Sequence, residues 1–258
     1  MKHNAEMLTK NKTLYIHQPN IDVYKAMATD EYLLQCVSDE QFAAAIHIYS
    51  WNHPCITLGR FTPSDVLKEN CDIPVTRRIT GGNALYHEND IAYSVVIKLD
   101  ENKNIGLELC KKISEIIQTI FSDFQINTKL ILNERNLNNR RLPCNETFSR
   151  CELICNNKKI AASAQKNNRL AILQQGSIYL NHQPQEINKY LNQANGIVNA
   201  IDKLDIDKSI FMQKLGKKIS ESFDMNPAAT LSCEQQKIID NLIYQKYRTC
   251  EWIWQNSK

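Results

Sequence analysis

Two adjacent glycines constrain the fold of this chain more than any other feature, because its 258 residues include only seven glycines. Gly81 and Gly82 let the backbone turn sharply, and they let a ligand approach the main chain where no Cβ stands in the way. Arg77 and Arg78 come shortly before the pair, and the alternating apolar run 91–97 follows it. This pattern predicts a basic strand, a glycine turn and a return strand that form one wall of a small-molecule pocket. An ordinary hairpin with a glycine-rich turn explains the same residues equally well.

The composition is that of a globular protein with a proper core, since 43% of the residues are hydrophobic and 23% are charged. The net charge of +3 is too balanced to indicate nucleic-acid binding, although it is compatible with a mildly basic face that docks an acidic partner. The chain lacks an apolar run of about 18 residues, so we expect no transmembrane helix. Residues 1–12 are polar and lack a signal-peptide core, which predicts a cytoplasmic protein that does not bind a membrane.

The nine cysteines indicate reduced thiols rather than a disulfide framework, because their number is odd and none of them form a CxxC pair. The closest cluster is Cys144, Cys151 and Cys155, and no histidine lies between them. This is a poor spacing for zinc, so no metal site is expected.

Short apolar runs and longer helical repeats follow one another along the chain and predict a mixed fold. We expect strands over 14–17, 43–51, 55–58, 74–79, 84–86, 91–99, 129–132, 151–155, 159–164 and 170–173, and helices over 23–37, 105–121, 185–193, 209–223 and 233–246, with a short helix from 63 and a polar loop at 133–141. The fold class is therefore α+β, with a largely antiparallel sheet and flanking helices. No repeat or linker divides the chain, so we expect a single domain over 1–258, with C-terminal helices from about 206 to 258 packed on it.

Six sequence blocks resemble the lipoate–protein ligase and octanoyltransferase superfamily, whose domain is related to the catalytic domain of biotin ligases. The blocks are Met27–Leu34, Thr57–Phe61, Arg77–Gly82, Lys159–Gln165, Gln175–Ser177, and Lys246–Tyr247 before Glu251–Trp252. They run in the order of that superfamily and span nearly the whole chain. The resemblance implies the catalytic domain fold of biotin and lipoate ligases, which is similar to class II synthetases.

The chain departs from the superfamily pattern at three positions. Asn83 stands where a third glycine is usual, Ala162 stands for a glycine after the lysine motif, and Gln175 stands for a histidine before Gly176. The resemblance implies that adenylate-forming members bring backbone close to a phosphate at the glycine turn, whereas octanoyltransferases often carry a larger side chain there. Asn83 therefore favours the octanoyltransferases.

The resemblance implies one of two reactions. Ligases of the superfamily use ATP and Mg²⁺ to form lipoyl-adenylate, whereas octanoyltransferases hold an acyl group on a cysteine. Cys144 follows Pro143 and precedes the segment Cys151-Glu152-Leu153, which resembles the octanoyltransferase pattern, and we expect Cys144 to be the nucleophile. Cys151 is the second candidate. The octanoyltransferase reaction needs no cofactor, because the acyl group arrives already activated as a thioester.

The resemblance also implies roles for residues near this cysteine. Lys159 is expected to lower the pKa of Cys144 and to stabilise the oxyanion of each tetrahedral intermediate. Arg77 and Arg78 alternate across a strand, so that only one of them, which we take to be Arg78, can face the pocket. One of the two is expected to hold a wall of the pocket or to meet the acidic carrier. The remaining substrate-binding candidates are Gly81, Gly82, Asn83, His87, Ser163, Gly176 and Ser177. His87 is either a general base or a structural hydrogen-bonding group.

The expected partners are octanoyl-acyl carrier protein as donor, and a lipoyl domain or the glycine-cleavage H protein as acceptor. Three alternatives remain open at this stage. They are an ATP-dependent lipoate ligase, an amidotransferase that moves acyl groups between lipoyl proteins, and a non-catalytic paralogue that binds lipoyl domains.

Overall fold

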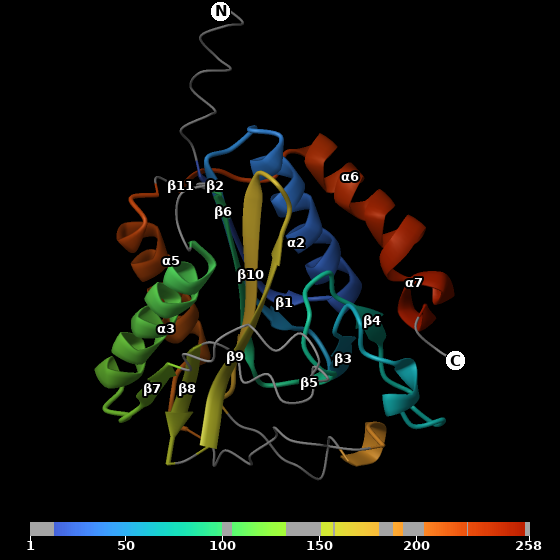
Figure 1. The fold of residues 1–258 in the computed structure, drawn as a ribbon, viewed down its shortest axis with the longest axis horizontal. Coiled ribbons are helices and arrows are strands. Elements are labelled where there is room, and N and C mark those ends of the chain that lie inside the picture. Colours follow the sequence, from blue (N-terminus) through green and yellow to red (C-terminus); the bar gives the residue numbers. More distant parts are fainter. Residues whose placement is uncertain are drawn as a thin grey trace, which may run out of the picture.

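The computed structural model describes residues 13–99, 105–132, 151–156, 158–180, 188–192, 204–225 and 227–255. Figure 1 shows a long twisted sheet with helices on both faces. The order of strands in this sheet is β11-β1-β2-β6-β10-β9-β8-β7. Its strands are β1 (Thr13–Ile21), β2 (Ala44–Trp51), β6 (Ile91–Lys98), β7 (Lys129–Leu132), β8 (Cys151–Cys155), β9 (Lys158–Asn167), β10 (Ala171–Ile178) and β11 (Pro227–Ala229). The predicted α+β class with a largely antiparallel sheet is confirmed, although β1 pairs in parallel with β2 and with β11.

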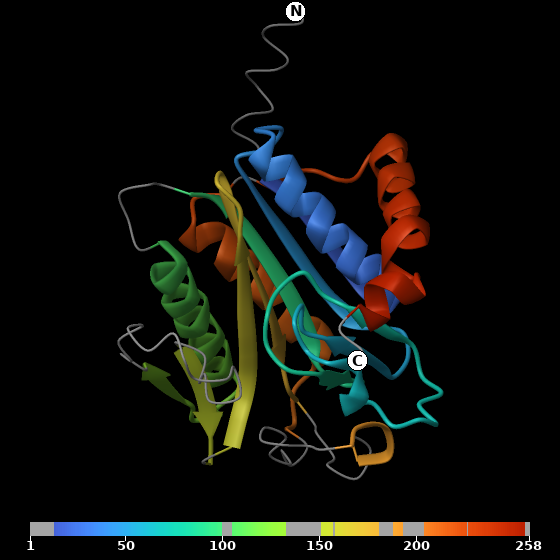
Figure 2. The same cartoon turned by 45° about the vertical axis from the view of Figure 1, so that its right-hand side comes forward.

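Two layers of helices cover the two faces of the sheet (Figures 1 and 2). On one face lies α2 (Val23–Ser38), with α6 (Cys233–Leu242) packed beside it. On the other lie α3 (Ile105–Asp123) and α5 (Lys208–Ser222). A π-helical turn at Ile243–Tyr247 and the short helix α7 (Cys250–Trp254) follow α6. Within the described residues, every helix is too short or too polar to cross a bilayer.

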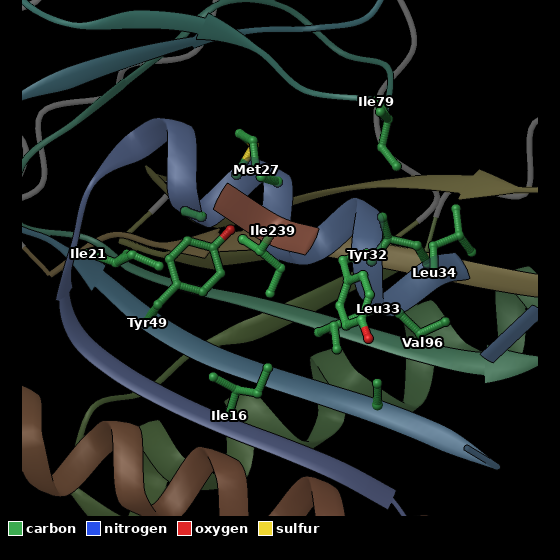
Figure 3. Close-up of a cluster of buried hydrophobic side chains, with 14 of the residues drawn as sticks. Ile16, Ile21, Met27, Tyr32, Leu33, Leu34, Tyr49, Ile79, Val96 and Ile239 are labelled. Carbon is green, nitrogen blue, oxygen red and sulfur yellow. The ribbon is translucent and has the colours of Figure 1, made fainter. Parts of the chain in front are cut away.

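The central strands alternate between two apolar cores, because consecutive side chains of a strand point to opposite faces of a sheet. On β2, Ala45 and Tyr49 join the core under α2, whereas Ile46 and Ile48 join the core under α3 and α5. Figure 3 shows the first of these cores, in which Leu33 of α2 is fully buried against the sheet. Both faces of the central strands are therefore apolar, and only a few polar side chains lie among them.

A small second sheet carries the glycine turn, and its strand order is β4-β3-β5. Its strands are β3 (Cys55–Leu58), β4 (Val75–Arg77) and β5 (Leu85–His87). The interpretation of the turn as an ordinary hairpin is wrong, because the strands on either side of the turn do not pair with each other. Ile56 in β3 is the partner of Val75 in β4 and also of Tyr86 in β5. The glycine turn therefore crosses over the end of β3, and β6 lies in the large sheet rather than beside it.

Most other predicted elements are present, with shifted ends. The strand predicted at 14–17 continues to Ile21, and the helix predicted over 233–246 changes from α to π geometry after Leu242. Strand β11 and helix α7 were not predicted, because they are only three and five residues long and lack a periodic pattern. The loop predicted at 133–141 lies outside the described residues. Of the helix predicted over 185–193, residues 188–192 are described, and 188–190 are helical.

Candidate functional site

The glycine turn is held from inside by Arg78, which is buried at the end of β4. Its guanidinium donates hydrogen bonds to the carbonyl oxygens of Thr57 at 2.9 Å, Gly81 at 3.0 Å and Asn83 at 2.6 Å. Burial lowers the pKa of Arg78 to about 10. Because the Gly81 and Asn83 carbonyls flank Gly82 and the Thr57 carbonyl belongs to β3, Arg78 fixes the shape of the turn and ties it to β3.

Arg77 points to the opposite side of β4, as the alternation predicts, and it is also buried. Its guanidinium donates to the carbonyl oxygens of Gly59 and Thr62, both at 2.6 Å, and of Ile253 at 2.8 Å. Burial lowers the pKa of Arg77 as well. Both arginines are thus bound to backbone carbonyls in the interior, which fits the expected role of holding a wall better than contact with a carrier protein.

The glycines of this region differ in what surrounds them. A Cβ added at Gly59 would lie only 1.8 Å from the carbonyl oxygen of Gly82, so the loop after β3 touches the glycine turn directly. Gly82 has φ +92°, which favours glycine. At Gly81, an added Cβ would meet no described atom within 4 Å. With respect to the described residues, the Gly81 side of the turn therefore borders open space.

Asn83 fits the turn without backbone strain, because Gly82 is the residue of this turn with positive φ. Ala162 is similarly placed in regular strand geometry on β9, where it pairs with Ser177. Both departures from the superfamily pattern are therefore compatible with the fold.

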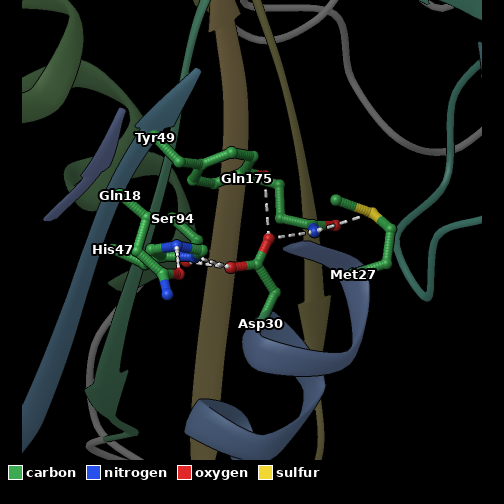
Figure 4. Close-up of polar contacts among 7 residues, drawn as sticks. All are labelled: Gln18, Met27, Asp30, His47, Tyr49, Ser94 and Gln175. Atoms are coloured by element: carbon green, nitrogen blue, oxygen red, sulfur yellow. Dashed lines mark hydrogen bonds and ion pairs between the residues drawn. The ribbon is translucent and has the colours of Figure 1, made fainter. Parts of the chain in front are cut away.

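A buried carboxylate, Asp30, lies in the middle of α2 and gathers four side chains from the sheet (Figure 4). These partners come from β2, β6 and β10. They are His47 (Nδ1 at 2.8 Å), Tyr49 (hydroxyl at 3.0 Å), Ser94 (hydroxyl at 2.6 Å) and Gln175 (Nε2 at 2.6 Å). Asp30 lies in the sequence block Met27–Leu34, but no role was predicted for it. An acidic residue within the apolar stripe of a helix could have indicated a buried polar site.

Gln175 connects this carboxylate to the glycine turn. Its Nε2 donates to Asp30, while its Oε1 accepts a hydrogen bond of 2.7 Å from the Thr80 hydroxyl. Thr80 directly precedes the two glycines and is fully buried. The residue that departs from the usual histidine therefore bridges the helix and the turn.

His87 behaves as a structural group, because both of its ring nitrogens have partners. Nδ1 lies 2.8 Å from a carboxylate oxygen of Asp90, and Nε2 lies 2.8 Å from the Thr57 hydroxyl. Burial by itself would raise the pKa of Asp90, but the charge and hydrogen bond of His87, with a contribution from Ser177, outweigh it and lower this pKa to about 2. His87 and Ser177 thus meet at one buried anion behind the turn.

Lys159 lies on β9 and forms an ion pair with Glu152 of β8, with 2.7 Å between Nζ and the carboxylate oxygen. Both side chains are about nine-tenths buried, at 11% and 10% exposed. The predicted nucleophile Cys144 lies outside the described residues. The pairing of Lys159 with it therefore stays a prediction.

The second candidate nucleophile, Cys151, sits in an unfavourable environment for a thiolate. It is buried, and a hydrogen bond with Cys110, followed by burial, raises the pKa of its thiol strongly. Because the thiolate is the reactive form, this thiol is a weak nucleophile. The described residues therefore favour a packing role for Cys151.

Gly176 and Ser163 face each other across β9 and β10. A Cβ added at Gly176 would lie 2.3 Å from the ring of Tyr93, so this glycine makes room for the ring. The Ser163 hydroxyl lies 3.8 Å from the sulfur of Cys110, a buried residue of α3. Packing explains Gly176, and a substrate contact for Ser163, Gly176 or Ser177 remains a prediction.

Comparison with known proteins places these features in one family. The model of the lipoyl protein ligase A/B catalytic domain matches residues 22–223. Octanoyltransferase LipM of Clostridioides difficile is 27% identical, over 94% of this chain and 98% of its own length. Octanoyltransferase LipM of Bacillus subtilis is also 27% identical, over 95% of this chain and 99% of its own length.

Two solved structures share the fold at lower identity. A bipartite lipoate protein ligase of Thermoplasma acidophilum superimposes with a TM-score of 0.74 at 16% identity, covering 96% of this chain and 98% of its own. Lipoate-protein ligase A bound with ATP gives a TM-score of 0.73 at 19% identity, covering 94% of this chain and 97% of its own. The match of the family model over most of the chain is decisive: this protein belongs to the lipoyl protein ligase A/B catalytic domain family.

Proposed function

We propose that this protein is an octanoyltransferase of lipoate biosynthesis. The observation that carries the proposal is the similarity to proteins named octanoyltransferase LipM over nearly the full length of both chains. The glycine turn supports it, since no described atom lies within 4 Å of a Cβ built at Gly81, which leaves room for an acyl chain against the backbone. The donor is octanoyl-acyl carrier protein, and the acceptor is a lysine of a lipoyl domain or of the glycine-cleavage H protein.

The reaction runs in two steps through a thioester on Cys144. The Cys144 thiolate attacks the thioester carbonyl of the donor, and the thiolate of the carrier leaves. The amine of the acceptor lysine then attacks the acyl-cysteine, loses a proton, and forms an amide as the Cys144 thiolate departs. Each step begins from a thioester, which already activates the acyl group. The reaction therefore requires neither ATP nor a cofactor.

Lys159 serves both steps in this proposal. An ammonium group carries three hydrogens, and the ion pair with Glu152 uses one of them. The others can donate to the carbonyl oxygen of the acyl group as it becomes an oxyanion. A donor held in a mostly buried site stabilises such a charge far better than one in water. Glu152 keeps the ammonium group in place and compensates its charge before substrate binds.

The test compares two complete reaction mixtures with a purified lipoyl domain as acceptor. One contains octanoyl-acyl carrier protein without ATP, and the other contains lipoate, ATP and Mg²⁺ without the carrier. The proposal expects octanoylation of the acceptor in the first mixture, detected as a mass gain of one octanoyl group. Modification in the second mixture alone would make the protein an ATP-dependent lipoate ligase.

A further inference from the structure

Three buried side chains from distant parts of the chain form one continuous hydrogen-bonded connection to the glycine turn. Asp30 comes from α2, Gln175 from β10, and Thr80 from the start of the turn. The hydrogen-bonded pairs are 145 and 95 residues apart in sequence. Asp30 and Thr80 are fully buried, and Gln175 is nearly so, which means that water does not satisfy their polar atoms.

The direction of each hydrogen bond explains why these residue types suit the connection. A buried carboxylate accepts only, so it requires donors on every side, and Gln175 supplies one of them through Nε2. The amide oxygen of the same side chain is then left to accept from the Thr80 hydroxyl. Gln175 therefore transmits the position of Asp30 to Thr80 with no unsatisfied atom between them.

The backbone of Thr80 is held as well. Its carbonyl oxygen accepts a hydrogen bond of 2.8 Å from the amide of Arg60, in the loop that contacts Gly82. Thr80 is thus fixed by its side chain toward α2 and by its backbone toward the loop after β3. Arg78 holds the far side of the turn through the carbonyls of Gly81 and Asn83.

We propose that Asp30 and Gln175 are positioning residues for acyl transfer, and that they set the location of the Gly81-Gly82 wall through Thr80. They act through another residue and do not touch the substrate. This inference rests on the proposed function, because it assigns the turn to the acyl-binding wall. A displacement of such a wall by even 1 Å can lower a reaction rate about a hundredfold.

Replacing Thr80 and Thr76 separately with valine tests the proposal, because the two threonines are closely matched. Both are fully buried, and each donates one hydrogen bond, of 2.7 Å from Thr80 to Gln175 and of 2.8 Å from Thr76 to the carbonyl oxygen of Tyr247. Thr80→Val is expected to lower kcat for octanoyl transfer at least about tenfold per folded molecule, whereas Thr76→Val should change it less than about twofold. Equal kcat values for the two variants would overturn the proposal.

Gln175 variants test the connection itself. Gln175→Met removes both hydrogen bonds, and combining it with Thr80→Val should lower kcat no further than the worse single variant, because the two residues act as a unit. Gln175→His retains one donor and one acceptor and should recover most of the loss. Additive losses in the double variant would contradict the proposal.

Hydrogen exchange of the Arg60 amide, which donates a hydrogen bond of 2.8 Å to the Thr80 carbonyl oxygen, provides a readout that does not depend on activity. Thr80→Val and Gln175→Met should speed exchange there at least about tenfold, while Thr76→Val should leave it unchanged. If the wild type transfers no octanoyl group, the proposed function fails, but these exchange rates still test the positioning role. Unchanged exchange in Thr80→Val would show that the connection is ordinary core packing.

Discussion

Replacing Gly59 with alanine tests the contact on which the glycine turn depends. The new Cβ would lie 1.8 Å from the carbonyl oxygen of Gly82 and 2.9 Å from the Thr62 hydroxyl, whereas ordinary contact begins at 3.4 Å. Backbone must therefore move by about 1.6 Å, and overpacking of this kind costs about 1–3 kcal/mol. Loss of the 2.8 Å hydrogen bond from the Thr62 hydroxyl to the Gly82 carbonyl oxygen would cost about 0.5–1.5 kcal/mol more.

Urea unfolding of Gly59→Ala should accordingly show a loss of about 1.5–4.5 kcal/mol in the free energy of unfolding. Gly81→Ala makes the same chemical change in the same turn, where the Cβ meets no described atom within 4 Å and φ is not positive. It should leave stability unchanged or raise it by up to about 1 kcal/mol. Because its methyl group projects into the proposed acyl site, it should instead lower the transfer rate. Equal stabilities of the two variants would refute the assigned contact between the loop and the turn.

Three further predictions concern the site and the groups behind it. Lys159→Met should lower octanoyl transfer by several orders of magnitude in a steady-state assay, and Lys158→Met on the same strand should retain most of it. Since the pKa of Asp90 is lowered from 3.8 to about 2, its contribution of about 2 kcal/mol to stability should be present above pH 4 and disappear as the pH falls to 2. Urea unfolding across that range should show this slope in the wild type and its absence in Asp90→Asn. Gly176→Ala should lower the melting temperature, because its Cβ would lie 2.3 Å from the Tyr93 ring; an unchanged value would contradict the packing role.

The layered fold could largely be predicted from sequence because its signals are local. The mostly apolar run of β2 and the helical spacing of Leu109, Ile113 and Ile117 in α3 each depend on one segment alone. Strand pairing, in contrast, depends on segments that are far apart in the sequence. The turn at Gly81 and Gly82 resembles a hairpin in sequence, and nothing local indicates that β3 lies between the strands on either side of it.

The buried polar groups were harder to predict for the same reason. The sequence left open whether Arg77 and Arg78 hold a pocket wall or meet an acidic carrier, and in the fold each donates to a set of buried backbone carbonyls. The role of Asp30 depends on Gln175, which lies 145 residues away. Side-chain partners at such separations follow from the tertiary fold, so a single sequence indicates the residue types without indicating which of them meet.

Intact-protein mass spectrometry after incubation with octanoyl-acyl carrier protein, in the absence of ATP, tests the central claim most directly. The wild type and the Cys151→Ser variant should each gain the mass of one octanoyl group, in a form that hydroxylamine removes, and Cys144→Ser should lose this hydroxylamine-labile adduct. An adduct that persists in Cys144→Ser and disappears in Cys151→Ser would contradict the assignment of the nucleophile. The absence of any adduct on the wild type, together with transfer of lipoate only when ATP is present, would contradict the transferase mechanism.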